Sequence, residues 1–66
     1  MLDLSDALER LAEQDSDAGE MARLHLLTGL SVEEASEVMA IARATGYRQW
    51  TYARAWLRTA LANPTD

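Results

Sequence analysis

The 66-residue chain has no cysteine and only one histidine. Without thiols it forms neither a disulfide nor a thiolate metal site, and one histidine is too few for a zinc site built from side chains. A chain of this length buries only about 60% of the surface that its unfolded form exposes. We therefore expect a single domain, residues 1–66, stabilised by apolar packing alone.

Long apolar runs and a basic start are also missing. No stretch approaches the roughly 18 apolar residues that a membrane span needs, and the opening MLDLSD lacks the positive charge of a secretory signal. The sequence further lacks a nucleophile–base pair, a glycine-rich phosphate loop and metal-ligand spacing. We expect a cytoplasmic protein that is not an enzyme and has no cofactor, no small-molecule substrate and no membrane partner.

Charge is unevenly distributed along the chain. Residues 1–42 hold ten acids and two arginines, a net charge of −8, whereas residues 43–61 hold four arginines and no acid. The overall charge of −5 argues against a nucleic-acid partner, but the cationic second part could approach a duplex. The same segment also fits an ordinary solvated helix that is rich in arginine, so composition leaves both interpretations open.

Helical spacing of the apolar residues predicts four helices and no strand. The first is expected to begin at a Ser5 cap, and the second to stop at Gly29 in the left-handed conformation. Ser31 and Glu34 have the spacing of a capping box for the third helix, and Asn-Pro at 63–64 should end the fourth. The expected ranges are about 5–14, 16–28, 32–39 and 44–61. This pattern predicts an all-α, four-helix domain.

The apolar positions of these helices predict one core. We expect it to include Leu8, Leu11, Leu24, Leu27, Val38, Ile41, Trp50 and Leu57. His25 falls in the second helix and is expected to be a packing or solvated residue, or to pair with a nearby acid. Gly46 falls on the core face of the last helix, so Gly46→Ala should raise stability unless the third helix comes too close for a methyl group.

The last two helices have the layout of a helix-turn-helix, a short helix followed by a tight turn and a longer helix. At 100° per residue, one face of the last helix is apolar. The opposite face holds Ala44, Arg48, Thr51, Ala55 and Arg58, flanked by Arg43, Tyr47 and Arg54. Short side chains allow close approach to bases, and arginines bind phosphates or guanine edges. For Arg54 and Arg58, phosphate contact and simple solvation remain equal alternatives, and both tyrosines also fit packing roles.

Several motifs are typical of one family. They are GLSVEEA at residues 29–35, RAT at 43–45, Arg48 with Trp50, and ARAWLR at 53–58. Together with the preceding helices they resemble the fourth conserved region of extracytoplasmic-function (ECF) sigma factors. Response-regulator output domains share the glycine-leucine-serine start but not the tryptophan-rich end. The sequence departs from the family pattern at Ala40, Ala42, Gly46 and Tyr47, where a turn glycine, a serine cap, a β-branched residue and often a lysine are usual.

The resemblance implies a winged-helix-like domain of the sigma region-four type, without the wing, that docks on the RNA polymerase core. By that likeness its last helix recognises the minus-thirty-five promoter element, in a bacterial cytoplasm and nucleoid-associated through polymerase. The residues that face promoter DNA would be Arg43, Thr45, Tyr47, Arg48 and Thr51. The alternative is a protein-interaction domain that binds RNA polymerase or an anti-sigma factor without productive DNA contact, through its acidic first part.

Overall fold

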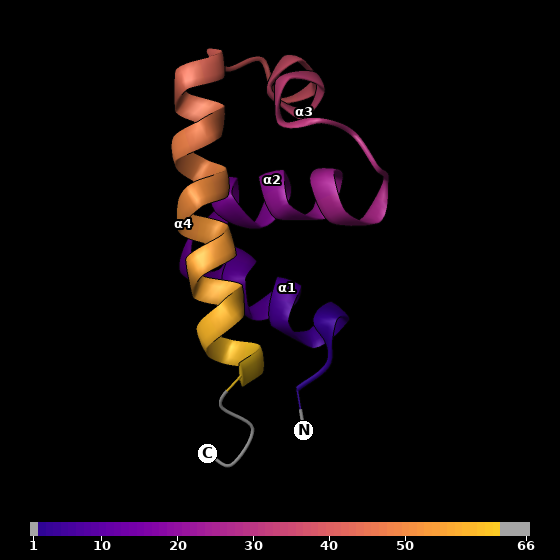
Figure 1. The fold of residues 1–66 in the computed structure, drawn as a ribbon, viewed down its shortest axis with the longest axis vertical. Coiled ribbons are helices and arrows are strands. Elements are labelled where there is room, and N and C mark those ends of the chain that lie inside the picture. Colours follow the sequence, from indigo (N-terminus) through magenta and orange to yellow (C-terminus); the bar gives the residue numbers. More distant parts are fainter. Residues whose placement is uncertain (1, 63–66) are drawn as a thin grey trace.

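The computed structural model describes residues 2–62, which form four helices and no strand (Figure 1). Their bounds are α1 (Leu4–Gln14), α2 (Ser16–Leu27), α3 (Val32–Met39) and α4 (Arg43–Ala62). Helices α1 and α2 cross the same long side of α4, and α3 lies beside its first turns (Figure 1). The all-α prediction is confirmed. The predicted stop at residues 63–64 lies outside the described residues, and no described helix has the length and apolar character of a membrane span.

Aspartates cap the first two helices. Asp3 has an extended backbone and its Oδ1 accepts the Asp6 amide at 2.8 Å, so α1 begins at Leu4. The predicted Ser5 cap is therefore wrong, because Ser5 already lies inside the first turn. Asp15 ends α1 and caps α2, accepting the Ala18 amide at 3.0 Å. A single extended residue thus produces the sharp corner between two adjacent helices.

The connection from α2 to α3 follows the predicted chemistry. Gly29 has a φ of +79°, the left-handed conformation that a residue with a Cβ adopts at a cost. The Glu34 amide donates to Ser31 Oγ at 3.0 Å, and the Ser31 amide donates to the Glu34 carboxylate at 2.9 Å. Both halves of the capping box are present, so the prediction is confirmed and the start of α3 is fixed.

The core has two parts, and Trp50 of α4 packs against both. One lies between α1, α2 and α4 and includes Ala7, Leu8, Leu11, Ala18, Ala22, Ala53 and Leu57; the other includes Met21, Leu24, Val32 and Ala35. The core predictions for Leu27 and Val38 are wrong, since these side chains are 58% and 63% exposed. Leu27 is the last residue of α2 and rims an open groove between α1 and α2. Val38 lies off the buried face of α3, which Val32, Ala35 and Ser36 form.

Helices α3 and α4 are in very close contact at Gly46. A Cβ built on Gly46 would overlap Ser36 Oγ and would lie 3.3 Å from Met21 Cε. Ser36 is 1% exposed, and its hydroxyl donates to the Val32 carbonyl at 2.8 Å, so it has little freedom to move away. The exception attached to the Gly46→Ala expectation therefore applies. We now expect that substitution to destabilise the fold.

The turn between these helices contains a left-handed alanine. Ala40 has φ 60° and ψ 42°, and its amide donates to the Glu37 carbonyl at 3.1 Å. The Ile41 amide donates to the Ser36 carbonyl at 3.0 Å. These bonds close the end of α3, but an L-residue with a Cβ is strained in this conformation.

Candidate nucleic-acid interface

The outer face of α4 is a continuous exposed surface. Gly46, Ala53 and Leu57 are buried on the inner side and fix the rotation of the helix about its axis. The opposite side therefore faces solvent. Every residue that the helical wheel assigned to it is exposed, namely Ala44, Arg48, Thr51 and Ala55 with Arg58, and so are the flanking Arg43, Tyr47 and Arg54. Thr45 is the one candidate site residue that is only partly exposed, because it lies next to the buried Gly46.

This outer face is cationic. It carries Arg43, Arg48, Arg54 and Arg58, and α4 contains no acidic residue. The only ion pair within residues 2–62 joins Arg23 to Glu20, both in α2, at 2.8 Å. Among residues 2–62, no arginine of α4 forms an ion pair with a carboxylate. Such guanidinium groups are free to bind phosphate oxygens or guanine edges.

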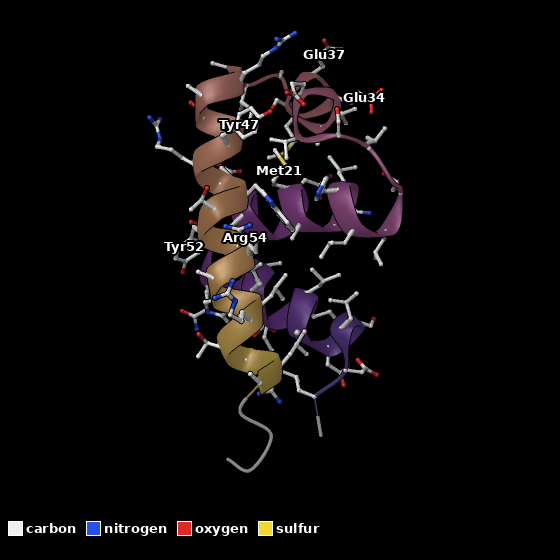
Figure 2. The ribbon with its side chains drawn as sticks, in the orientation of Figure 1. Met21, Glu34, Glu37, Tyr47, Tyr52 and Arg54 are labelled. Carbon is white, nitrogen blue, oxygen red and sulfur yellow. The ribbon has the colours of Figure 1, made fainter. Side chains whose placement is uncertain are left out.

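A hydrogen bond links the first turns of α3 and α4. The Tyr47 hydroxyl donates to a carboxylate oxygen of Glu33, and Figure 2 shows the Tyr47 side chain reaching from α4 towards α3. This bond lowers the pKa of the Glu33 carboxyl from its ordinary 4.5, and the charge of Arg43 contributes in the same direction. The same bond raises the pKa of Tyr47. Tyr47 is thus held against α3 by its tip while 46% of its surface stays exposed.

Sequence analysis did not pair these two residues, because Glu33 and Tyr47 lie on different helices. No local pattern signals this bond. The turn joins the end of α3 to the start of α4, so a contact with the first turn of α3 depends on the angle at which the two helices cross.

A shallow hollow lies on the outer face of α4 beside this pair. It is lined by Tyr47, Arg48, Thr51 and Tyr52, and we call these four residues the tyrosine hollow. Tyr52 is 47% exposed and points away from α2 and α3 in Figure 2, so neither tyrosine is a core residue. The guanidinium of Arg48 donates to Thr45 Oγ1 at 3.4 Å, which keeps it near the helix surface.

His25 has a structural role. Its Nδ1 lies 2.7 Å from the Leu30 carbonyl oxygen, and its ring meets Trp50 edge-on with centroids 4.5 Å apart. These contacts match the packing alternative, and the pairing of His25 with an acid is not observed. Among the described residues, no group of three or more histidines, cysteines or acids is placed to hold a metal ion.

The sequence of these helices was compared with models of known protein families, and one model matches. The family model described as ECF sigma factor matches residues 1–63, a stretch that contains all four helices. Comparison with curated proteins gave no match, and neither did comparison with solved structures.

Proposed function

Because this chain belongs to the ECF sigma factor family, we propose that its part in transcription initiation is to recognise the minus-thirty-five promoter element with α4. Sigma factors act with RNA polymerase at promoter DNA and are not enzymes. In our proposal, Arg43, Thr45, Tyr47, Arg48 and Thr51 face the bases and the adjoining backbone. Arg54 and Arg58 bind phosphates farther along the helix.

One observation carries the proposal. All four arginines of α4 are exposed beside short residues such as Ala44, Thr51 and Ala55, and α4 has no acid. Short side chains let the helix axis approach base edges in a major groove, which is wide enough for an α-helix. Negatively charged DNA complements this surface, whereas residues 1–42, with a net charge of −8, would be repelled from it.

Arg48 and Arg58 are assigned different roles by their positions. Across the width of the outer face Arg48 lies near the centre, and along the helix it lies close to the start of α4. The first turns of a recognition helix are the part that contacts base edges. Arg58 is ten residues later, which is about 15 Å along a helix that rises about 1.5 Å per residue. At that distance the groove has curved away from a straight helix, so Arg58 would meet the phosphate backbone.

The test is a selection from a pool of randomised duplexes at low salt, first with the chain alone and then in the presence of RNA polymerase core. Affinity of the chain alone should be modest, because its cations are few and polymerase normally holds such a domain at high effective concentration. Arg48→Ala should reduce discrimination between the enriched and random duplexes by about 1–3 kcal/mol. Arg58→Ala should weaken all duplexes alike and lower the salt slope by about one unit.

Arg10→Ala provides a matched control, since it removes one positive charge from an exposed position on α1 and leaves α4 unchanged. It should change neither discrimination nor the salt slope. If no sequence is enriched even with RNA polymerase present, the proposal that α4 recognises a promoter element is wrong.

The second candidate is a protein-interaction role without productive DNA contact, with RNA polymerase or an anti-sigma factor as the partner. Leu26 and Leu27 are 41% and 58% exposed at the end of α2, and Leu27 rims the groove between α1 and α2. Exposed apolar side chains in an acidic region are typical of a protein contact. This candidate takes precedence if the duplex selection fails while binding to polymerase persists.

A further inference from the structure

The tyrosine hollow differs chemically from the surface around it. Arg48 is one of its four lining residues, but the exposed surface of the lining is mostly apolar. An apolar depression in a cationic face is unexpected for a surface that binds only phosphates. It would suit a ligand that combines negative charge with a small apolar group.

Duplex DNA offers one such group in the major groove. Thymine carries a 5-methyl group on its base edge, and the other three bases of unmodified DNA have no methyl group there. Arg48 forms part of the hollow, so an arginine bound to one base edge would place a neighbouring base beside the two rings. A methyl group is small enough for a shallow hollow, whereas a whole base would not enter it.

The walls of the hollow are held in different ways. Tyr47 is tied to α3 through its hydrogen bond to Glu33, so one ring has a fixed position before DNA arrives. Thr51 is β-branched and lies within α4, where a threonine side chain is restricted mainly to two χ1 rotamers. Tyr52 supplies the opposite wall and is bonded to no described side chain. Because the Tyr47 wall is fixed before binding, the site loses less conformational entropy when a ligand binds.

We propose that the tyrosine hollow binds the 5-methyl group of a thymine in the promoter element, and that Tyr52 is a specificity-determining residue for it. This inference rests on the proposed function, since it requires α4 to lie in the major groove. It adds a base preference that arginine contacts alone would not give. The thymine should lie next to the base pair whose recognition depends on Arg48.

The test replaces thymine with uracil, which lacks the 5-methyl group and keeps the base pairing. In the duplex enriched from the randomised pool, each thymine is changed to uracil in turn, and binding by the full chain is measured. One position should lose affinity about fourfold, the value of burying a single methyl group. Uracil at the other positions should have little effect.

Two variants identify the hollow as the site of this preference. Tyr52→Ala removes one wall and should bind the thymine and uracil duplexes equally. Tyr52→Phe keeps the ring and removes only the hydroxyl, so it should retain the fourfold preference. Because Tyr52 is exposed, both variants should keep the helix content of the parent chain, which circular dichroism checks.

The outcomes separate this inference from the proposed function. Failure to enrich any sequence contradicts both. An enriched sequence whose recognition depends on Arg48, but which contains no thymine or binds equally well with uracil throughout, supports the proposed function and overturns the hollow as a methyl site. A uracil effect that is the same in Tyr52→Ala and in the parent chain also overturns it, because the methyl group is then bound elsewhere.

Discussion

Gly46→Ala tests how closely α3 and α4 are packed. In an exposed helix, alanine is about 1 kcal/mol more favourable than glycine, so propensity alone favours the substitution. In this chain the new methyl group would overlap Ser36 Oγ and lie 3.1 Å from Ser36 Cβ. The sign of the effect depends on whether Ser36 can move.

The structure indicates that it cannot move cheaply. Ser36 is 1% exposed and its hydroxyl is bonded to the Val32 carbonyl, so rotation would bury an unpaired hydroxyl at a cost of about 1–3 kcal/mol. Moving α3 instead would strain the packing, which costs about 1–3 kcal/mol in overpacked cores. After the gain of about 1 kcal/mol in propensity, Gly46→Ala should lower the free energy of unfolding by up to about 2 kcal/mol. For a domain of this size the melting temperature should fall by roughly 4–8 °C for each kcal/mol lost.

A double-mutant cycle assigns the loss to this contact. Ser36→Ala removes the overlapping oxygen and should cost less than about 1 kcal/mol alone, because the lost hydrogen bond is local to α3. Urea unfolding followed by circular dichroism would give the free energy of all four chains. The double variant should recover at least about 1 kcal/mol relative to the sum of the single effects. A higher melting temperature for Gly46→Ala, or strictly additive effects, would refute the reasoning.

Three further substitutions test the turn and the interface. Ala40→Gly should raise the free energy of unfolding by about 1 kcal/mol in urea titrations, since glycine adopts the left-handed conformation without strain; an unchanged midpoint would contradict this. Ala42→Ser supplies a side chain that can cap α4 and should add about 1 kcal/mol, with Ala42→Val as the control that should add nothing. Tyr47→Phe removes the donor to Glu33, so an NMR titration should show the Glu33 pKa rising towards 4.5. Because that pKa is lowered in the folded chain, the ionised carboxylate stabilises the fold above about pH 4.5 and the contribution is lost as pH falls through the folded pKa. Tyr47→Phe should therefore lose less stability on acidification than the parent, and an unchanged Glu33 pKa would argue against the hydrogen bond.

Local sequence signals predicted most of the helical layout. The capping box at Ser31 and the left-handed Gly29 follow from side-chain and backbone chemistry within a few residues, and the structure has both. The Ser5 cap was wrong because two capping residues lay within three positions, and periodicity does not say which of them begins a helix. Choosing between Asp3 and Ser5 requires knowing where the first turn packs.

The failures in the core have a different cause. Leu27 and Val38 satisfy the spacing of apolar residues in their own helices, but spacing does not tell where a neighbouring helix ends. Leu27 is the last residue of α2, and Val38 lies off the face of α3 that Val32, Ala35 and Ser36 bury. In the candidate interface, the wheel correctly separated the exposed from the buried face of α4, because Gly46, Ala53 and Leu57 fix its rotation. The Glu33–Tyr47 bond needed tertiary structure, since neither residue alone indicates a partner on another helix.

Four of the expected departures from the family pattern, at Ala40, Ala42, Gly46 and Tyr47, fall at the joint between α3 and α4. The structure indicates how this joint is held without the usual turn residues. Ala40 is strained in the left-handed conformation, and Ala42 has no side chain that can cap α4, so backbone chemistry stabilises this turn poorly. Two contacts between the helices compensate. Glycine at position 46 lets α4 approach the bonded hydroxyl of Ser36, and Tyr47 reaches Glu33 on the outside of the same joint. Orientation of the proposed recognition helix therefore depends on these two contacts more than on the turn. It follows that Gly46→Ala should weaken binding to an enriched duplex by more than Ala40→Gly strengthens it, even though Gly46 itself is buried and cannot touch DNA.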